Sequence, residues 1–205
     1  MKLNSSTVIV GNKVVLVPYK KIHVPKYHKW MQRKDLQEAT ASEPLSEEEE
    51  YHMQNTWFLD EDKCTFIILD KKIINSTNNE IDAMIGDVNL YLSNIDGKKI
   101  AECGIMIAEN SARGQGKGFE ALALMLKYGC EVLNVQKFEA KINLSNYVSL
   151  NLFKKIGFKL IDKNIFLEAI LVNEVQEEYK KWLNEVTNGL SIISYDELLR
   201  CNLNS

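Results

Sequence analysis

Three closely spaced glycines and one arginine are the residues of this sequence whose types and spacing most directly suggest chemistry. Arg113, Gly114, Gly116 and Gly118 fall in the segment SARGQGKG, between an apolar run and a helical pattern. Glycine lacks a Cβ, so the backbone can turn its N–H groups inward there and approach an anion closely. The helix that follows adds free N–H groups and a partial positive charge. The segment therefore predicts a phosphate site that needs no metal ion.

Two familiar phosphate-binding loops do not fit this segment. A mononucleotide loop ends in Gly-Lys-Ser/Thr, but Gly118 stands where the hydroxyl residue belongs. The dinucleotide pattern Gly-x-Gly-x-x-Gly fails at Phe119 when it is counted from Gly114. Counted from Gly116 it survives in a relaxed form with Ala121, but far from an opening strand–helix–strand unit. What remains is Arg-x-x-Gly-x-Gly, which suits a pyrophosphate; the alternative is a flexible strand–helix connection.

The composition narrows the class of protein. A chain of 205 residues with 45% hydrophobic residues can form one domain with a sizeable core. The formal net charge of −3 gives no strong field for nucleic acid or an anionic membrane, and there is no long apolar run to span a bilayer. The four cysteines form no metal-binding pattern, and the N-terminal segment has no secretory pattern. We therefore expect a cytoplasmic protein with reduced thiols and with no metal, nucleic-acid partner or membrane association.

Hydrophobic periodicity and turn residues predict the elements that must position the glycine loop. Strands are expected over residues 13–19, 63–70, 83–93, 100–109, 137–143, 158–162 and 165–172, and helices over residues 23–32, 46–59, 119–133 and 146–157. Asp96-Gly97 predicts an antiparallel hairpin, and the Asn-rich segment 71–82 is expected to be a loop. This order predicts an α/β domain of the α+β type over residues 1–172, with a partly helical tail over residues 173–205. Its mixed, mostly antiparallel sheet has about seven strands flanked by about four helices.

Two motifs carry a resemblance to a known superfamily. The pattern Arg113-x-x-Gly116-x-Gly118, between a strand and a helix, resembles the acetyl-CoA loop of the GCN5-related N-acetyltransferases, the GNAT superfamily. The segment NYVSLNLFKKIGF, residues 146–158, resembles the Asn-x-x-Ser…Leu-Phe/Tyr…Gly-Phe helix of the same superfamily. The order and spacing of the motifs match, and the expected elements follow its fold from residue 13 to residue 172. The resemblance implies the GNAT fold, acetyl-CoA as co-substrate and acetyl transfer to an amine.

The same resemblance implies which residues hold acetyl-CoA. The strand before the loop is expected to offer backbone groups to the pantetheine arm, from Ile105, Met106 and Ile107. An N–H near Met106 or Ile107 would hold the thioester oxygen. The pyrophosphate is expected on the loop amides of Arg113, Gly114, Gln115, Gly116, Lys117 and Gly118. Lys117 is further expected either to add charge at the phosphates or to be a solvated surface residue. Asn146 is predicted to cap a helix and, by resemblance, to contact the pantetheine or the acetyl group.

Glu102 is the candidate general base, acting directly or through water. It lies eleven residues before Arg113, a spacing that resembles the histone-acetyltransferase members, in which a Glu on this strand is the base. On strand parity it shares a face with Gly104, whose small size could leave room for the amine. The alternative is a surface-paired carboxylate. Phe153 stands where many members have a tyrosine that protonates the departing thiolate, so we expect a packing or CoA-stacking residue there and no assigned general acid.

A finer resemblance and the distribution of charge suggest the acceptor. Segments along nearly the whole chain, such as VVLVPY, HVPKYHKWM and IGDVNLYL, resemble a eukaryotic subfamily of N-acetyltransferases associated with tubulin N-termini and microtubule stability. The acidic segment 40–50 lies where this fold lines its acceptor groove, and it would attract a basic peptide or cationic amine. The sequence thus predicts an acetyl-CoA-dependent N-acetyltransferase acting on a protein α-amine. The alternatives are a small-molecule amine acetyltransferase and a non-catalytic acetyl-CoA-binding protein that stabilises microtubules by contact.

Overall fold

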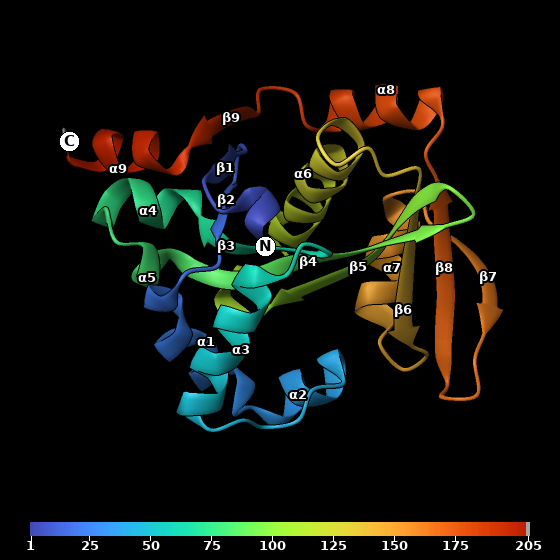
Figure 1. Cartoon of the computed structure of the whole chain (residues 1–205), viewed down its shortest axis with the longest axis horizontal. Helices are drawn as coiled ribbons and strands as arrows, with labels where there is room; N and C mark the ends of the chain where they lie inside the picture. The colour runs from blue at the N-terminus through green and yellow to red at the C-terminus, as the bar shows by residue number, and fades with distance from the viewer. Residues whose placement is uncertain (204–205) are drawn as a thin grey trace.

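A single nine-stranded sheet forms the centre of the protein (Figure 1). The structure, a computed structural model, describes residues 1–203. The strands are β1 (Thr7–Val10), β2 (Val14–Pro18), β3 (Lys63–Asp70), β4 (Met84–Ile95), β5 (Lys98–Ile107), β6 (Lys137–Asn143), β7 (Lys159–Lys163), β8 (Glu168–Glu174) and β9 (Ser191–Ser194). Their order is β7-β8-β6-β5-β4-β3-β2-β1-β9. Neighbouring strands in this described sheet run antiparallel, apart from the parallel pair β5 and β6.

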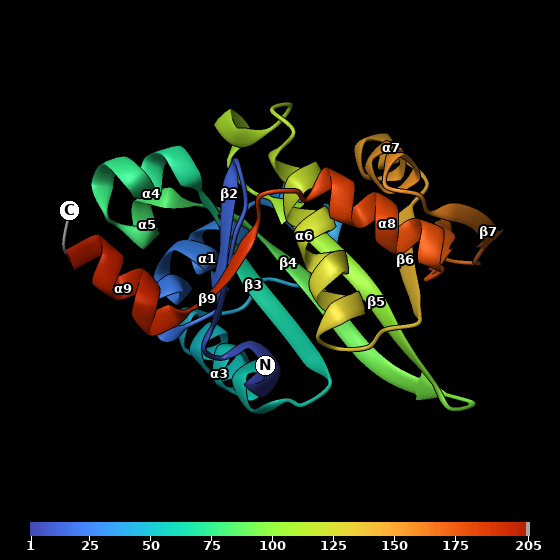
Figure 2. The ribbon, with the colours of Figure 1, turned by 90° about the horizontal axis from the view of Figure 1, so that it is seen from above.

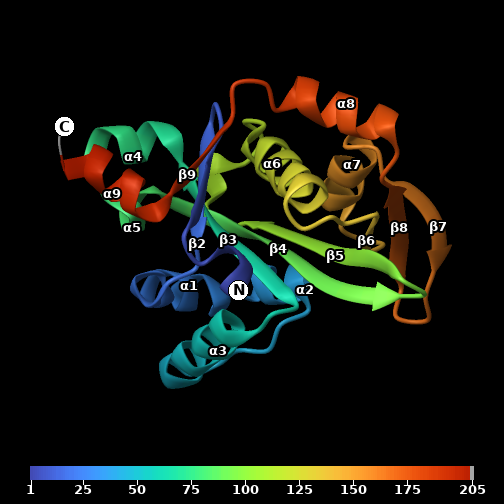
Figure 3. The same ribbon diagram turned by 45° about the horizontal axis from the view of Figure 1, so that its top comes forward.

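Helices cover both faces of the sheet. They are α1 (Val24–Met31), α2 (Lys34–Thr40), α3 (Glu47–Leu59), α4 (Lys71–Thr77), α5 (Glu80–Ala83), α6 (Lys117–Glu131), α7 (Tyr147–Lys155), α8 (Glu177–Val186) and α9 (Tyr195–Leu203). Figure 3 shows α1, α2 and α3 below the sheet and α6, α7 and α8 above it. The sheet is therefore the middle layer of three, which explains why its central strands are apolar on both faces.

Strand β2 shows how one short run of residues supplies two cores. Val14 and Leu16 belong to the hydrophobic cluster that contains the buried residues of α6, whereas Val15 and Val17 belong to the cluster that contains those of α1. Successive side chains of a strand point to opposite faces, so an uninterrupted apolar run is required when both faces are covered.

The structure confirms the expected class of fold, but the sheet has nine strands rather than about seven. The two additional strands are β1 and β9, each four residues long, and they pair with each other over Thr7↔Ser194 to Val10↔Ser191. Four residues are too few to display a hydrophobic period. Strand β9 is specified by pairing with a partner almost the whole chain away, which local pattern cannot reveal.

The expectation of a loop over residues 71–82 is wrong, because this segment forms α4 and α5. Asp70 caps α4 by accepting hydrogen bonds from the backbone of Lys72 and Ile73, and Asn79 caps α5 in the same way. Two of the three asparagines that suggested a loop, Asn78 and Asn79, are therefore helix-terminal residues. By contrast, the predicted hairpin is confirmed: β4 and β5 pair antiparallel, with Asp96 and Gly97 at positive φ in the turn.

The last segment of the chain packs on the domain. Helix α8 lies over α6, and β9 extends the sheet beyond β1, as seen from above in Figure 2. Among residues 1–203, no helix combines the length and the apolarity needed to cross a bilayer. Cys64, Cys103 and Cys130 are free thiols; the reduced thiol expected at Cys201 lies outside the described side chains.

Candidate active site

The parallel strands β5 and β6 diverge, and a cavity opens where they separate. Their pairing covers only Ile100↔Lys137 to Glu102↔Glu139, so the rest of β5 has a free edge on this side. A cavity of about 570 Å³ lies at the divergence, between β4, β5, β6, α2 and α7. Five of the predicted site residues line it, namely Glu102, Ile105, Met106, Asn146 and Phe153. The structure thus brings the strand that precedes the glycine loop and the second motif together around one opening in the sheet, whereas Ile107 and the loop residues 113–118 lie outside the cavity lining.

The ladder between β4 and β5 decides which backbone groups of β5 face the divergence. The N–H of Ala108 donates to the carbonyl of Ile85 in the direction of β4, at 2.8 Å. Antiparallel pairs alternate in the direction of their hydrogen bonds, so Met106 faces β4 while Ile105 and Ile107 face the divergence. A contact of Arg113 agrees with this direction: its Nε donates to the carbonyl of Ile107, on the side away from β4, at 2.8 Å.

The glycine loop connects the end of β5 to the start of α6. Gly114 and Gly116 have φ of +71° and +76°, and Gly116 is the N-cap of α6. A Cβ on Gly118 would lie 3.4 Å from Cγ1 of Ile107, in ordinary contact, so the start of α6 packs directly against the end of β5. The first turn of a helix leaves its N–H groups without intrahelical acceptors. The loop therefore presents an anion site next to the free edge of β5.

The side chain of Lys117 points neither to the loop, where it would add charge at the phosphates, nor to solvent. Its ammonium forms a buried ion pair with Asp70 at 2.5 Å, with both side chains no more than 10% exposed. The lysine at the loop is instead Lys13, whose Nζ donates to the carbonyl of Gln115 at 2.9 Å. That Nζ lies 2.9 Å from the position of a Cβ on Gly116. Sequence reasoning missed Lys13 because it is a hundred residues from the loop and belongs to the β1–β2 turn.

Replacing Lys117 by Met should therefore reduce stability more than acetyl-CoA affinity. Removing one partner of a buried pair costs about 3–5 kcal/mol, measured as the free energy of unfolding in urea. Burial raises the pKa of Asp70, but hydrogen bonds from Lys117 and the backbone of Lys72 outweigh it, so this pKa is lowered overall. The ionised Asp70 carboxylate contributes its full share to the free energy of unfolding above its pKa in the unfolded chain, about 3.9. That contribution is lost as the pH falls through the lower pKa of Asp70 in the folded protein. The stability gap between wild type and variant should narrow in acid; loss of affinity at unchanged stability would contradict this role.

Arg113 supports the loop from the protein surface. Its guanidinium holds the carbonyl of Ile107 and lies 4.0 Å from the carboxylate of Asp35. Its backbone N–H donates to the carbonyl of Asn110 at 3.2 Å, within the short 3-10 helix Asn110–Ala112. The side chain and N–H of Arg113 are thus both engaged, and the anion-facing groups are those that follow it.

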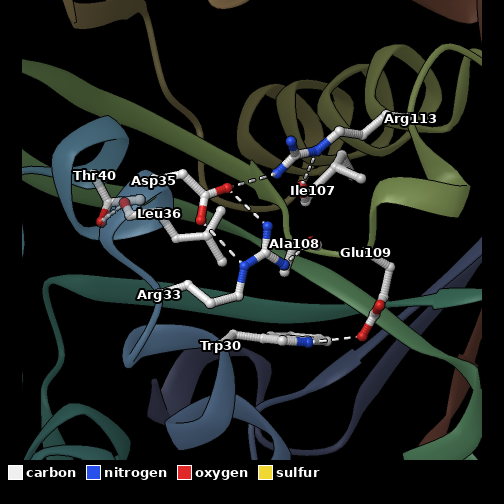
Figure 4. A network of polar contacts seen from close by, with 9 residues as sticks. All are labelled: Trp30, Arg33, Asp35, Leu36, Thr40, Ile107, Ala108, Glu109 and Arg113. Atoms are coloured by element: carbon white, nitrogen blue, oxygen red, sulfur yellow. Dashed lines mark hydrogen bonds and ion pairs between the residues drawn. The ribbon is translucent and has the colours of Figure 1, made fainter.

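A polar network ties the α1–α2 connection to the end of β5 (Figure 4). Arg33 donates to the carbonyl of Ala108 at 2.8 Å and pairs with Asp35 at 2.7 Å. The hydrogen bond from Arg33 is the main reason why the pKa of Asp35 is lowered. Because Asp35 also faces the guanidinium of the loop, helix α2 on the cavity wall is fixed relative to the glycine loop.

Glu102 lies at the mouth of the cavity in an ion pair. Its carboxylate accepts a hydrogen bond from Lys141 of β6 at 2.7 Å, and its side chain is 41% exposed. The hydrogen bond that Lys141 donates to Glu102 raises the pKa of Lys141. Glu102 is the last residue of β5 in the ladder, where it pairs with Glu139, and Lys141 lies two residues further along β6, so the ion pair spans the point at which the strands separate.

Asn146, the N-cap of α7, and Phe153 within α7 lie on the wall of the cavity that this helix forms. The predicted cap is confirmed, because Asn146 accepts a hydrogen bond from the N–H of Ser149 at 3.1 Å. Phe153 is buried and meets Phe158 edge to face, with ring centroids 5.0 Å apart. It packs in the core beside the cavity, and its stacking on CoA stays a prediction. No group of three or more potential metal ligands occurs within the described residues.

Known proteins resemble this chain along most of its length. A family model for the acetyltransferase (GNAT) domain matches residues 13–159. An N-acetyltransferase 9-like protein of Nematostella vectensis is 52% identical over 173 residues, which cover 83% of this chain and 87% of that protein. Alpha/beta-tubulin-N-acetyltransferase 9 of Homo sapiens is 46% identical over 192 residues, which cover 92% of this chain and 93% of that protein.

The fold is also similar to that of a solved enzyme. The structure of spermidine N-acetyltransferase from Vibrio cholerae, in complex with CoA and spermine, matches with a TM-score of 0.65 at 17% identity. The match covers 91% of this chain and 98% of the Vibrio cholerae chain. With the family model matching most of the chain and relatives near half identical, this chain belongs to the GNAT acetyltransferase family and is an N-acetyltransferase.

Proposed function

We propose that this enzyme transfers the acetyl group of acetyl-CoA to the N-terminal α-amine of a protein, with tubulin as the acceptor, in the cytoplasm. The observation that carries the proposal is the free edge of β5, which runs from the cavity to the glycine loop. An extended pantetheine arm can lie along such an edge, with its thioester at the cavity and its pyrophosphate on the N–H groups before and within the first turn of α6. The residues present therefore fit acetyl-CoA.

The roles of the chain's own groups follow from this placement. Ile105 and Ile107, whose backbone groups face the divergence, would offer them to the pantetheine, and the N–H of Ile107 would hold the thioester oxygen as charge develops on it. Lys13 adds positive charge at the loop. From the sequence, Glu102 stays the candidate acceptor of the amine's proton. Because Phe153 has no hydroxyl, the departing thiolate takes its proton from the amine itself or from water.

The acceptor side of the cavity favours a cation. The lining residues include one lysine, Lys141, and four carboxylates. The carboxylates are Glu38, Asp87, Glu102 and Glu168. Such a wall attracts an ammonium group and a basic peptide. The names of relatives in Homo sapiens, Mus musculus and Drosophila melanogaster specify alpha- and beta-tubulin, which supports tubulin as the acceptor; a role in microtubule stability is part of the proposal.

An acceptor panel tests the proposal. We expect acetylation of peptides with the N-terminal sequences of α- and β-tubulin, detected as a mass gain of one acetyl group on the α-amine. The same peptides with a blocked α-amine are the control and should stay unmodified. Turnover of spermidine but of neither peptide would favour a small-molecule enzyme. Acetyl-CoA binding without any product would favour the non-catalytic microtubule-stabilising alternative.

A further inference from the structure

We propose that Asp87 receives the proton of the acceptor's ammonium group, the role for which the sequence offers Glu102. This inference rests on the proposed function, because it concerns the acceptor amine at the same cavity. Asp87 lies on β4, lines the cavity and is 3% exposed. No pattern in the sequence distinguishes it, since its importance comes from the strand that pairs with β4.

The register places Asp87 beside the backbone that is to hold the thioester. Its partner across the β4–β5 ladder is Met106, and facing residues of an antiparallel pair have Cβ atoms about 4.5–5.5 Å apart. The next facing pair on the same side of the sheet is Asn89 and Gly104. A Cβ on Gly104 would find its nearest atom, Cβ of Asn89, at 3.9 Å. The open space over Gly104 therefore lets an amine reach Asp87 and the thioester together.

One oxygen of Asp87 is held in place and the other is free. Thr65 donates to Oδ1 of Asn89 at 2.6 Å, and Nδ2 of Asn89 donates to Oδ2 of Asp87. Oδ1 of Asp87 is buried and has no hydrogen-bond partner within the described structure. A buried carboxylate oxygen without a partner is unfavourable. Because carboxylates predominate on the cavity wall, an N–H of the acceptor amine is the donor expected to bind Oδ1 of Asp87.

The surroundings make Asp87 more basic than an ordinary aspartate. Burial raises its pKa to about 6, although the hydrogen bond from Asn89 and the charge of Lys63 lower it. At neutral pH the group is thus ionised and still able to hold a proton, which suits a general base. The other titratable side chains in the cluster around it come from the neighbouring elements, namely Tyr19 directly after β2, Tyr27 of α1, Glu50 of α3, Lys63 of β3, Tyr91 of β4 and Glu102 of β5.

Glu102 is less well placed for direct proton transfer. It lies four residues before Met106 on the same strand, which is about 13 Å at 3.3 Å per residue. Its carboxylate is already paired with Lys141. We therefore expect Glu102 to act as a positioning residue, which joins the two strands at the cavity mouth.

The chemical step balances with one ammonium and one thioester. Asp87 takes one proton from the ammonium, and the nitrogen lone pair then forms a bond to the carbonyl carbon. The carbon–sulfur bond breaks, its electron pair leaves on sulfur, and the second proton lost by nitrogen neutralises that thiolate. The products are the N-acetylated acceptor and CoA, and the proton on Asp87 returns to solvent.

The experiment compares Asp87→Asn with Glu102→Gln on a tubulin N-terminal peptide. Asp87→Asn keeps the size and one hydrogen bond of the side chain, so calorimetry should give unchanged acetyl-CoA affinity. General bases contribute about 10²–10⁴-fold, and we expect kcat to fall at least about 100-fold. In the wild type, kcat/KM should rise as the pH increases through about 6. The Asp87→Asn variant should not show this rise. The Glu102→Gln variant should still show it, and its KM should change more than its kcat.

Two further measurements keep the result unambiguous. A ¹³C NMR titration of the Asp87 carboxyl reports its ionisation without turnover, and Glu50→Gln is the matched control for another buried carboxyl outside the cavity lining. Full activity of Asp87→Asn, or loss of the rise in kcat/KM in Glu102→Gln alone, would overturn the proposal. An inactive wild type would instead refute the proposed function, since that result appears before any variant is compared.

Discussion

Replacing Gly116 by Glu should abolish measurable binding of acetyl-CoA. Gly116 caps α6 at φ +76°, and a side chain there is in the left-handed region, which costs about 1–2 kcal/mol for residues with a Cβ. The new carboxylate also lies where the pyrophosphate is proposed to bind. Because like-charge contacts cost several kcal/mol, and about 1.4 kcal/mol is tenfold in affinity, calorimetry should register a loss well beyond 100-fold.

Gly97→Glu is the matched control for this variant. Gly97 has nearly the same conformation, with φ +77°, in the turn between β4 and β5, and nothing lies within 4 Å of a Cβ placed on it. The Gly97→Glu variant therefore has a similar backbone strain and the same change in charge as Gly116→Glu, but at a site away from the loop. Gly97→Glu should lower stability slightly and bind acetyl-CoA normally. Equal binding by both variants would remove the loop from the donor site.

The positions that sequence alone predicted well are those whose role is local. The glycine loop, the cap at Asn146 and the hairpin at Asp96-Gly97 all depend on residues a few positions apart. Their conformations follow from backbone preferences that each residue type carries with it. The order of the seven expected strands and of α1, α3, α6 and α7 followed in the same way from hydrophobic period.

The parts that sequence missed depend on contacts between distant segments. Lys13 reaches the loop from the β1–β2 turn, and Lys117 turns away to Asp70. Asp87 gains its place only through the register with Met106. Periodicity says which face of a strand a side chain occupies, but the partner strand decides what it meets there. Candidate chemistry on a sheet therefore needs the pairing as well as the pattern.

Gly86 is another residue whose role emerges only from the pairing, and Gly86→Ala should remove most of the activity. A Cβ at Gly86 would lie 1.9 Å from the carbonyl oxygen of Met106, so the backbone of β5 must move. Overpacking of this kind costs about 1–3 kcal/mol, and each kcal/mol lowers Tm by about 2–4 °C in a domain of this size. The displaced strand carries the groups proposed to hold the thioester, and a misplacement of about 1 Å can reduce the rate about 100-fold.

Gly104→Ala distinguishes strand displacement from simple crowding of the site. Gly104 lies on β5 across from Asn89, and an added Cβ would make only ordinary contact at 3.9 Å. The strand should keep its position, with unchanged Tm and unchanged acetyl-CoA affinity, while the methyl group takes room from the acceptor and raises its KM. Gly86→Ala should instead lower Tm, acetyl-CoA affinity and kcat together. If both variants affected only the acceptor's KM, the close approach of β4 to β5 at Met106 would have no part in holding the donor, and the thioester would have to bind elsewhere along the strand.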